Sequence, residues 1–78
     1  GKHNVRVNCI SPGGLLGPVV GFSKKQNKNF LKQYSNNVLM KRLGNPNEIC
    51  GAVLFLGSNS SSYVTGANLI VDGGWLAI

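Results

Sequence analysis

The residues of this sequence that could do chemistry by themselves are few, and their spacing matches no complete metal site. His3 is the only histidine, and the two cysteines, Cys9 and Cys50, are too far apart for any known zinc-binding pattern. We therefore expect no bound metal. We interpret the cysteines as reduced thiols in apolar surroundings, as in a cytosolic protein.

Three glycines near the start of the sequence suggest a different chemistry, the binding of a nucleotide. Gly13, Gly14 and Gly17 lie close together, but their spacing differs from that of the glycine-rich turn that holds dinucleotide phosphates. We interpret the cluster as a turn after a strand and not as a phosphate-binding fingerprint.

The sequence is basic, with a formal net charge of +6 at pH 7. Four lysines fall largely on one face of a predicted helix, and this pattern is typical of a solvated surface; they are Lys24, Lys25, Lys28 and Lys32. A phosphate-binding patch on a small nucleic-acid binder is the alternative, but no nucleic-acid motif and no interleaved aromatic residues support it. No segment approaches the roughly 20 apolar residues of a membrane span, and we expect no signal peptide.

The first half of the sequence predicts a strand, a loop and a helix. Residues 4–10 alternate between apolar and polar side chains, which is the period of a strand, and Ser11-Pro12-Gly13-Gly14 ends it. An apolar loop rich in glycine follows as far as Gly21. Residues 22–39 carry apolar side chains three to four positions apart, which predicts a helix that breaks near Asn36-Asn37.

The second half predicts another helix and another strand. Asn45 can cap a helix that begins at Pro46, and Glu48 can reach back in a capping box. The apolar positions of this helix, 46–56, extend beyond one face, so we expect its sheet and a second subunit to cover it. Residues 67–71 are typical of a strand that is buried on both faces of a parallel sheet. Asp72-Gly73-Gly74 ends that strand, and we expect Asp72 to bond the backbone of its turn.

The order strand, helix, helix, strand predicts two parallel strands joined by a crossover. Two strands form half a sheet, so we expect an exposed edge. A 78-residue chain buries only about 60% of its unfolded surface, and it has no expected disulfide or metal to compensate. The sequence also lacks an initiator methionine, and we expect it to be a piece of a longer chain.

Three blocks of sequence resemble the classical short-chain dehydrogenases/reductases, in that family's order. Residues 5–13 are similar to its sixth strand and Pro-Gly turn, and residues 41–49 to the start of its late helix. Residues 55–74, which include Tyr63-Val64-Thr65-Gly66 and Val71-Asp72-Gly73-Gly74, resemble its seventh strand and terminal signature. The resemblance implies the C-terminal part of a single Rossmann-type domain over residues 1–78. About 19–39 would form its substrate-binding lobe.

This resemblance implies an NAD(P)-dependent oxidoreductase that transfers hydride between a nicotinamide cofactor, NAD or NADP, and a carbonyl or alcohol. The family's catalytic serine, tyrosine and lysine are expected upstream of Gly1. Its catalytic tyrosine is followed four positions later by lysine, whereas Val38 follows Tyr34 and Ala67 follows Tyr63. We therefore expect both tyrosines to be packing residues and the chain alone to be inactive.

The resemblance also implies that the turn after the first strand lies against the nicotinamide half of the cofactor. The implied contacts are Pro12, Gly13, Gly14, Leu15 and Gly17, and Leu15 matches the position whose backbone meets the carboxamide. The alternative is a turn that only ends the strand. Many members carry a threonine where this sequence has Gly17, so a backbone group, a water or a shifted loop would replace its hydroxyl. We expect residues 15–22 to order when the cofactor binds.

The implied partners are a small carbonyl or alcohol substrate and further subunits. The helix 46–56 and the strand 69–71 match the surface through which family members pair as dimers or tetramers in the cytoplasm. The ending resembles that of members that act on sugar acids, polyols or ketoacyl thioesters. The alternative is a truncated, non-catalytic chain that keeps the cofactor wall and the pairing surfaces.

Overall fold

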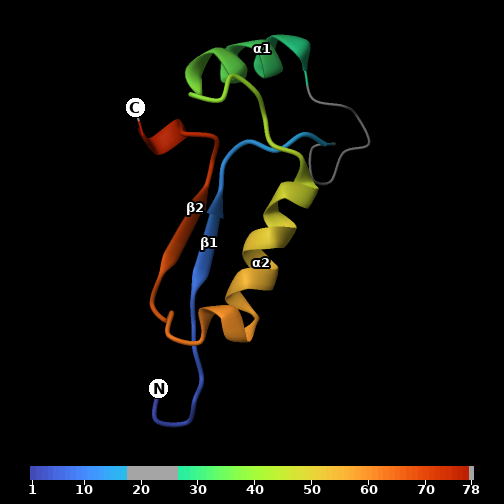
Figure 1. Ribbon diagram of the computed structural model, residues 1–78. Coiled ribbons are helices and arrows are strands. Elements are labelled where there is room, and N and C mark those ends of the chain that lie inside the picture. Colours follow the sequence, from blue (N-terminus) through green and yellow to red (C-terminus); the bar gives the residue numbers. More distant parts are fainter. Residues whose placement is uncertain (18–26, 78) are drawn as a thin grey trace.

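The structure is a computed structural model that describes residues 1–17 and 27–77. Two short strands and two α-helices, with three turns of 3-10 helix, make up these residues (Figure 1). In chain order they are β1 (Cys9–Pro12), α1 (Lys28–Asn37), η1 (Pro46–Ile49), α2 (Cys50–Leu56), η2 (Asn59–Ser61), β2 (Asn68–Val71) and η3 (Trp75–Ala77).

The two strands are parallel, as predicted, with Cys9 opposite Asn68 and Pro12 opposite Val71. The predicted bounds of the first strand, 4–10, are wrong. Before Cys9 the chain forms no regular ladder. The Gly66 N–H donates to the Val7 carbonyl at 2.8 Å, and the Asn8 side chain donates to the Val64 carbonyl and accepts from the Ala67 N–H. Pro12 can be the last residue of β1 because the next N–H, that of Gly13, donates to the Val71 carbonyl at 2.9 Å.

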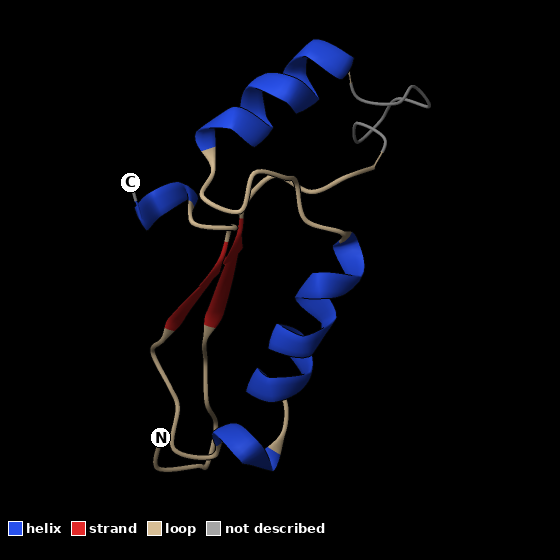
Figure 2. Cartoon of the chain, turned by 45° about the horizontal axis from the view of Figure 1, so that its top comes forward, coloured by secondary structure: helices blue, strands red, loops and turns tan. Residues whose placement is uncertain are grey.

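One face of the sheet is covered by α2, and the other is bare in the described part of the chain (Figure 2). On the covered side, Ile10 lines a hollow together with Val53 and Leu56 of the helix. On the other side Cys9 is exposed and its thiol donates to Asn68 Oδ1 at 3.3 Å. Within the described residues both cysteines are free thiols, but both are exposed, so the predicted apolar surroundings are wrong.

Very little of the described chain is buried. Among residues 1–17 and 27–77, Val38 and Leu43 are the only apolar residues whose side chains are buried. Large apolar side chains remain exposed before β1, on α2, on β2 and near the C-terminus. They include Val7, Leu54, Ile70 and Leu76. A chain with so few buried apolar groups has a core that needs further surface to complete it.

Both predicted helices form, the first over a shorter range than predicted and the second over the predicted range 46–56. Residues 28–37 are helical as α1, and Asn27 caps it by accepting from the Asn29 N–H at 2.7 Å. Residues 22–26 of that prediction lie outside the described residues. The second helix begins at Pro46 as predicted, but its first turn is the 3-10 helix η1. None of the helices in the described residues is long and apolar enough to cross a membrane.

Arg6 joins the chain before β1 to the segment that follows α2. Its guanidinium donates to the carbonyls of Leu56, Ser58 and Val64 at 3.0 to 3.2 Å, and to Ser61 Oγ at 3.0 Å. Ser61 is almost fully buried. Because the last carbonyls of a helix have no partner within the helix, Arg6 also satisfies the C-terminal end of α2.

Candidate functional site

The carboxyl ends of β1 and β2 lie side by side, and each continues into a glycine-containing turn (Figure 1). Ligands of parallel α/β sheets bind outside these ends of the strands. The five predicted cofactor residues lie here, with Pro12 closing β1 and Gly13 to Gly17 following it. A small hollow of about 80 Å³ opens between the two turns and the segment 40–49, and its lining includes Gly14, Leu15, Val71, Asp72 and Gly73.

The backbone of the turn after β1 is fixed by hydrogen bonds. The Leu16 N–H donates to the Gly44 carbonyl at 2.8 Å, and the Gly44 N–H donates to the Gly14 carbonyl at 3.0 Å. The Gly14 N–H donates to the hydroxyl of Tyr34. With the Gly13 bond to Val71, three N–H groups of the turn are engaged within the chain. The N–H groups of Gly13, Gly14 and Leu16 are therefore not available to a ligand. What the turn presents is a surface held in place by these bonds.

Tyr34 reaches this turn from α1 and packs between two other aromatic rings. Its ring stacks on Trp75 of η3 with centroids 4.8 Å apart and planes 10° apart, and it meets Phe30 at 5.9 Å. A β-carbon on Gly14 would lie 2.5 Å from Cζ of the same ring. The prediction that Tyr34 is a packing residue is confirmed. The same prediction for Tyr63 is wrong in the described chain, because Tyr63 is fully exposed.

The turn after β2 is held by Asp72, as predicted. Its carboxylate accepts from the Leu76 N–H at 2.9 Å and from the Gly74 N–H at 2.8 Å. The bonds from Leu76 and then Gly74 lower the pKa of Asp72 below its ordinary value. A β-carbon on Gly13 would lie 2.8 Å from the Asp72 Cα, so the two turns touch through backbone.

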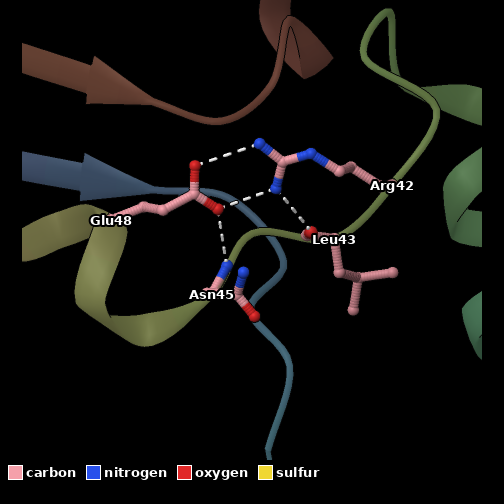
Figure 3. A network of polar contacts seen from close by, with 4 residues as sticks. All are labelled: Arg42, Leu43, Asn45 and Glu48. Atoms are coloured by element: carbon pink, nitrogen blue, oxygen red, sulfur yellow. Dashed lines mark hydrogen bonds and ion pairs between the residues drawn. The ribbon is translucent and has the colours of Figure 1, made fainter.

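A polar network at the start of η1 borders the same hollow (Figure 3). Arg42 forms a two-pronged bond to Glu48, at 2.7 Å and 3.0 Å, and also donates to the Leu43 carbonyl at 3.1 Å. Glu48 Oε1 accepts from the Asn45 N–H at 2.9 Å, the predicted reach back of the capping box. The Arg42 bond and then the Asn45 bond lower the pKa of Glu48 to about 2, and the Glu48 bond raises the pKa of Arg42.

The low pKa of Glu48 predicts a loss of stability in acid. A carboxylate with a depressed pKa in the folded state contributes stability that is fully present above its ordinary value of 4.5 and is lost as the pH falls through about 2. We expect the urea midpoint to fall over this range less steeply for Glu48→Gln than for the unchanged protein. Asp72 titrates in the same direction in both proteins, so the difference isolates Glu48. Equal slopes would contradict the prediction.

No group of three or more histidine, cysteine, aspartate or glutamate side chains in residues 1–17 and 27–77 could hold a metal. The hypothesis that residues 15–22 order on cofactor binding falls mostly outside the described residues. Sequence reasoning missed the bond from Gly14 to Tyr34, and the helical spacing of Phe30 and Tyr34 is the one signal that placed Tyr34 on a packed face.

A family model, curated relatives and solved structures all match most of this chain. A family model described as enoyl-(acyl carrier protein) reductase matches residues 1–76. The D-arabinitol 2-dehydrogenase (ribulose-forming) of Candida tropicalis is 41% identical over 75 residues, which is 95% of this chain and 27% of that protein. The 3-oxoacyl-(acyl-carrier-protein) reductase of Chlamydia trachomatis is 45% identical over 74 residues, 95% of this chain and 29% of that protein.

A solved structure matches in three dimensions. The short-chain dehydrogenase of Leptospira borgpetersenii with bound NAD⁺ superimposes with a TM-score of 0.75 and 44% identity, over 90% of this chain and 25% of that one. The predicted fold class, part of a Rossmann-type parallel α/β sheet, is thereby confirmed. The chain spans less than a third of the length of these proteins.

Proposed function

Because the chain belongs to the short-chain dehydrogenase/reductase family, we propose that it forms one wall of the nicotinamide pocket of an NAD(P)-dependent oxidoreductase. The observation that carries the proposal is the pair of parallel strands whose carboxyl ends both turn at glycines. Residues 1–78 would be part of one domain, with about 19–39 in the substrate-binding lobe.

The wall fits a flat ring better than a phosphate. Its residues are Pro12, Gly13, Gly14, Leu15 and Gly17, and the N–H groups of Gly13 and Gly14 are engaged within the chain. No atom of residues 1–17 and 27–77 lies within 4 Å of the place where a β-carbon on Gly17 would be. The nicotinamide, when bound, supplies the hydride acceptor or donor. The chain's own residues orient it and exclude water from it.

The acid/base group of the reaction belongs to another part of the natural protein. A phenol has an ordinary pKa of about 10 and needs a nearby ammonium to act as a base near neutrality. Tyr34 instead accepts a bond from Gly14 and has Val38 at the fourth position after it. We therefore expect these 78 residues alone to turn over no nicotinamide. The alternative, a truncated chain without catalysis, predicts that the natural protein is inactive as well.

The names of two relatives support a class of substrate. One is named as a dehydrogenase of D-arabinitol and the other as a reductase of 3-oxoacyl-(acyl-carrier-protein), and these names support a secondary alcohol or its ketone as substrate. The bound NAD⁺ of the Leptospira protein supports NAD or NADP as cofactor.

Subunit pairing would cover the outer side of α2. Leu54 is 72% exposed and Phe55 is 42% exposed, and exposed apolar side chains that lie together are typical of a surface that contacts a partner. A dimer or tetramer, formed in the cytoplasm through 46–56 and 69–71, would bury it.

The test compares the natural full-length protein with these 78 residues produced alone. The full-length protein is expected to bind NAD(H) or NADP(H) by calorimetry and to interconvert a polyol or 3-oxoacyl thioester with its partner ketone or alcohol. The 78-residue chain is expected to give no turnover with either cofactor. Turnover by the short chain would refute the assignment of the acid/base group, and no binding by the full-length protein would refute the proposed function.

A further inference from the structure

Tyr34 connects three segments that are far apart in the sequence. Its ring lies in α1, stacks on Trp75 near the C-terminus and meets Phe30 one turn earlier, while its hydroxyl accepts the Gly14 N–H. Gly14 is 20 positions before it in the chain. One side chain therefore holds the turn after β1 against α1 and η3, which lie together at the carboxyl ends of the strands (Figure 1).

The two functions of this side chain, packing and bonding, can be separated. The ring supplies apolar contact with Trp75, and that contact remains when the hydroxyl is removed. The hydroxyl supplies the acceptor for a part-buried N–H, and without it the Gly14 N–H has no partner in the described chain. The Gly14 carbonyl, which belongs to the next peptide, still accepts from the Gly44 N–H, so Gly14 would be held at its carbonyl alone.

We propose that Tyr34 is a positioning residue that sets the orientation of the Gly13–Gly14 peptide in the nicotinamide wall. The inference rests on the proposed function, since it concerns the same turn. It predicts that the hydroxyl acts on cofactor affinity and little on the chemical step. A turn that is pre-set in its bound geometry loses less freedom when the ligand arrives, and this raises affinity.

The first measurement needs no cofactor. Amide hydrogen exchange of the full-length protein should speed up at Gly14 in Tyr34→Phe, while Leu16 and Gly44 keep their protection because their own bonds are untouched. Tyr63→Phe is the matched control. Tyr63 is fully exposed, so removal of its hydroxyl should change exchange nowhere in the turn.

The second measurement is the dissociation constant for NAD(H) by calorimetry, together with kcat at saturating cofactor. We expect Tyr34→Phe to raise the dissociation constant about 3- to 10-fold, the effect of one lost hydrogen bond, with kcat changed less than about twofold. Trp75→Leu removes the stack and keeps the hydroxyl, so it should shift Gly14 exchange and cofactor affinity in the same direction. It serves if Tyr34→Phe does not fold.

The outcomes separate the two proposals. Faster exchange at Gly14 with an unchanged dissociation constant would overturn the positioning role and leave the proposed function intact. Unchanged exchange at Gly14 would overturn it too, because the bond would then not hold the turn. A full-length protein that binds no nicotinamide cofactor in any form would refute the proposed function itself.

Discussion

Replacement of Arg6 by alanine is expected to lower the free energy of unfolding of the full-length protein by about 3 kcal/mol, since bonds to charged groups contribute roughly 1.5 to 3 kcal/mol and four acceptors each lose one of their donors. Two of those acceptors are the carbonyls of Leu56 and Ser58 at the end of α2, the third is the Val64 carbonyl, and the fourth is the buried hydroxyl of Ser61. Water can replace the guanidinium at some of them, which keeps the sum below four separate losses. Urea unfolding with a constant slope measures the change.

Two further variants test the source of this loss in the free energy of unfolding. Arg6→Lys keeps the charge but offers one compact ammonium, so it should recover part of the loss and not all of it. Arg42→Ala removes a different arginine, whose ion pair with Glu48 is about half exposed, and exposed pairs contribute little. A loss for Arg6→Ala no larger than that for Arg42→Ala would contradict the prediction.

The features that sequence reasoning predicted are those that local chemistry decides. Pro12 and its glycines had to end a strand, because proline has no N–H to give and glycine turns easily. Asn45, Pro46 and Glu48 had to start a helix, and they do. The parallel pairing followed from the order of elements alone.

The features that it missed depend on contacts across the chain. The bounds of β1 were wrong because Asn8 bonds Val64 and Ala67 with its side chain, which no strand pattern encodes. The predictions that Cys9 has apolar surroundings and that Tyr63 is a packing residue were wrong. Both side chains are exposed, because burial depends on neighbouring surfaces that these two residues do not have in the described chain. The five residues of the candidate wall were predicted from the family resemblance. The hydrogen bonds that fix their backbone could not be predicted, because they join segments that are far apart in the sequence.

Replacement of Gly14 by alanine is the second change for which we expect a large effect, both on stability and on cofactor affinity. The added methyl group would lie 2.5 Å from Cζ of Tyr34 and within 2.9 Å of two other ring atoms, so the ring or the turn must move. The ring cannot move freely because it is stacked on Trp75. We expect the free energy of unfolding to fall by about 1 to 3 kcal/mol, as for other overpacked sites. We also expect the dissociation constant for the nicotinamide cofactor to rise more than about tenfold, which is the effect of roughly 1.4 kcal/mol.

Gly51→Ala is the matched control for Gly14→Ala, since it adds the same methyl group. It lies in α2 with no atom within 4 Å of the added carbon, and alanine favours a helix over glycine by roughly 0.5 to 1 kcal/mol. Gly51→Ala should therefore leave stability unchanged or raise it, with no effect on cofactor affinity. A loss of cofactor affinity in Gly51→Ala equal to that in Gly14→Ala would mean that the effect does not come from the turn.

A double-mutant cycle tests whether the Tyr34 ring is the group that the added methyl group of Gly14→Ala meets. In a Tyr34→Ala background the ring is gone, so Gly14→Ala should cost much less there than in the unchanged protein, and the two losses should not add. Gly13→Ala gives the opposite expectation, because its methyl group would meet the Asp72 backbone at 2.8 Å, and Tyr34→Ala leaves that contact in place. Rescue of Gly14→Ala without rescue of Gly13→Ala would assign the constraint on the wall to the tyrosine ring on one side and to the turn after β2 on the other. Additive losses in the Gly14 cycle would instead place the cost in the backbone of the turn itself.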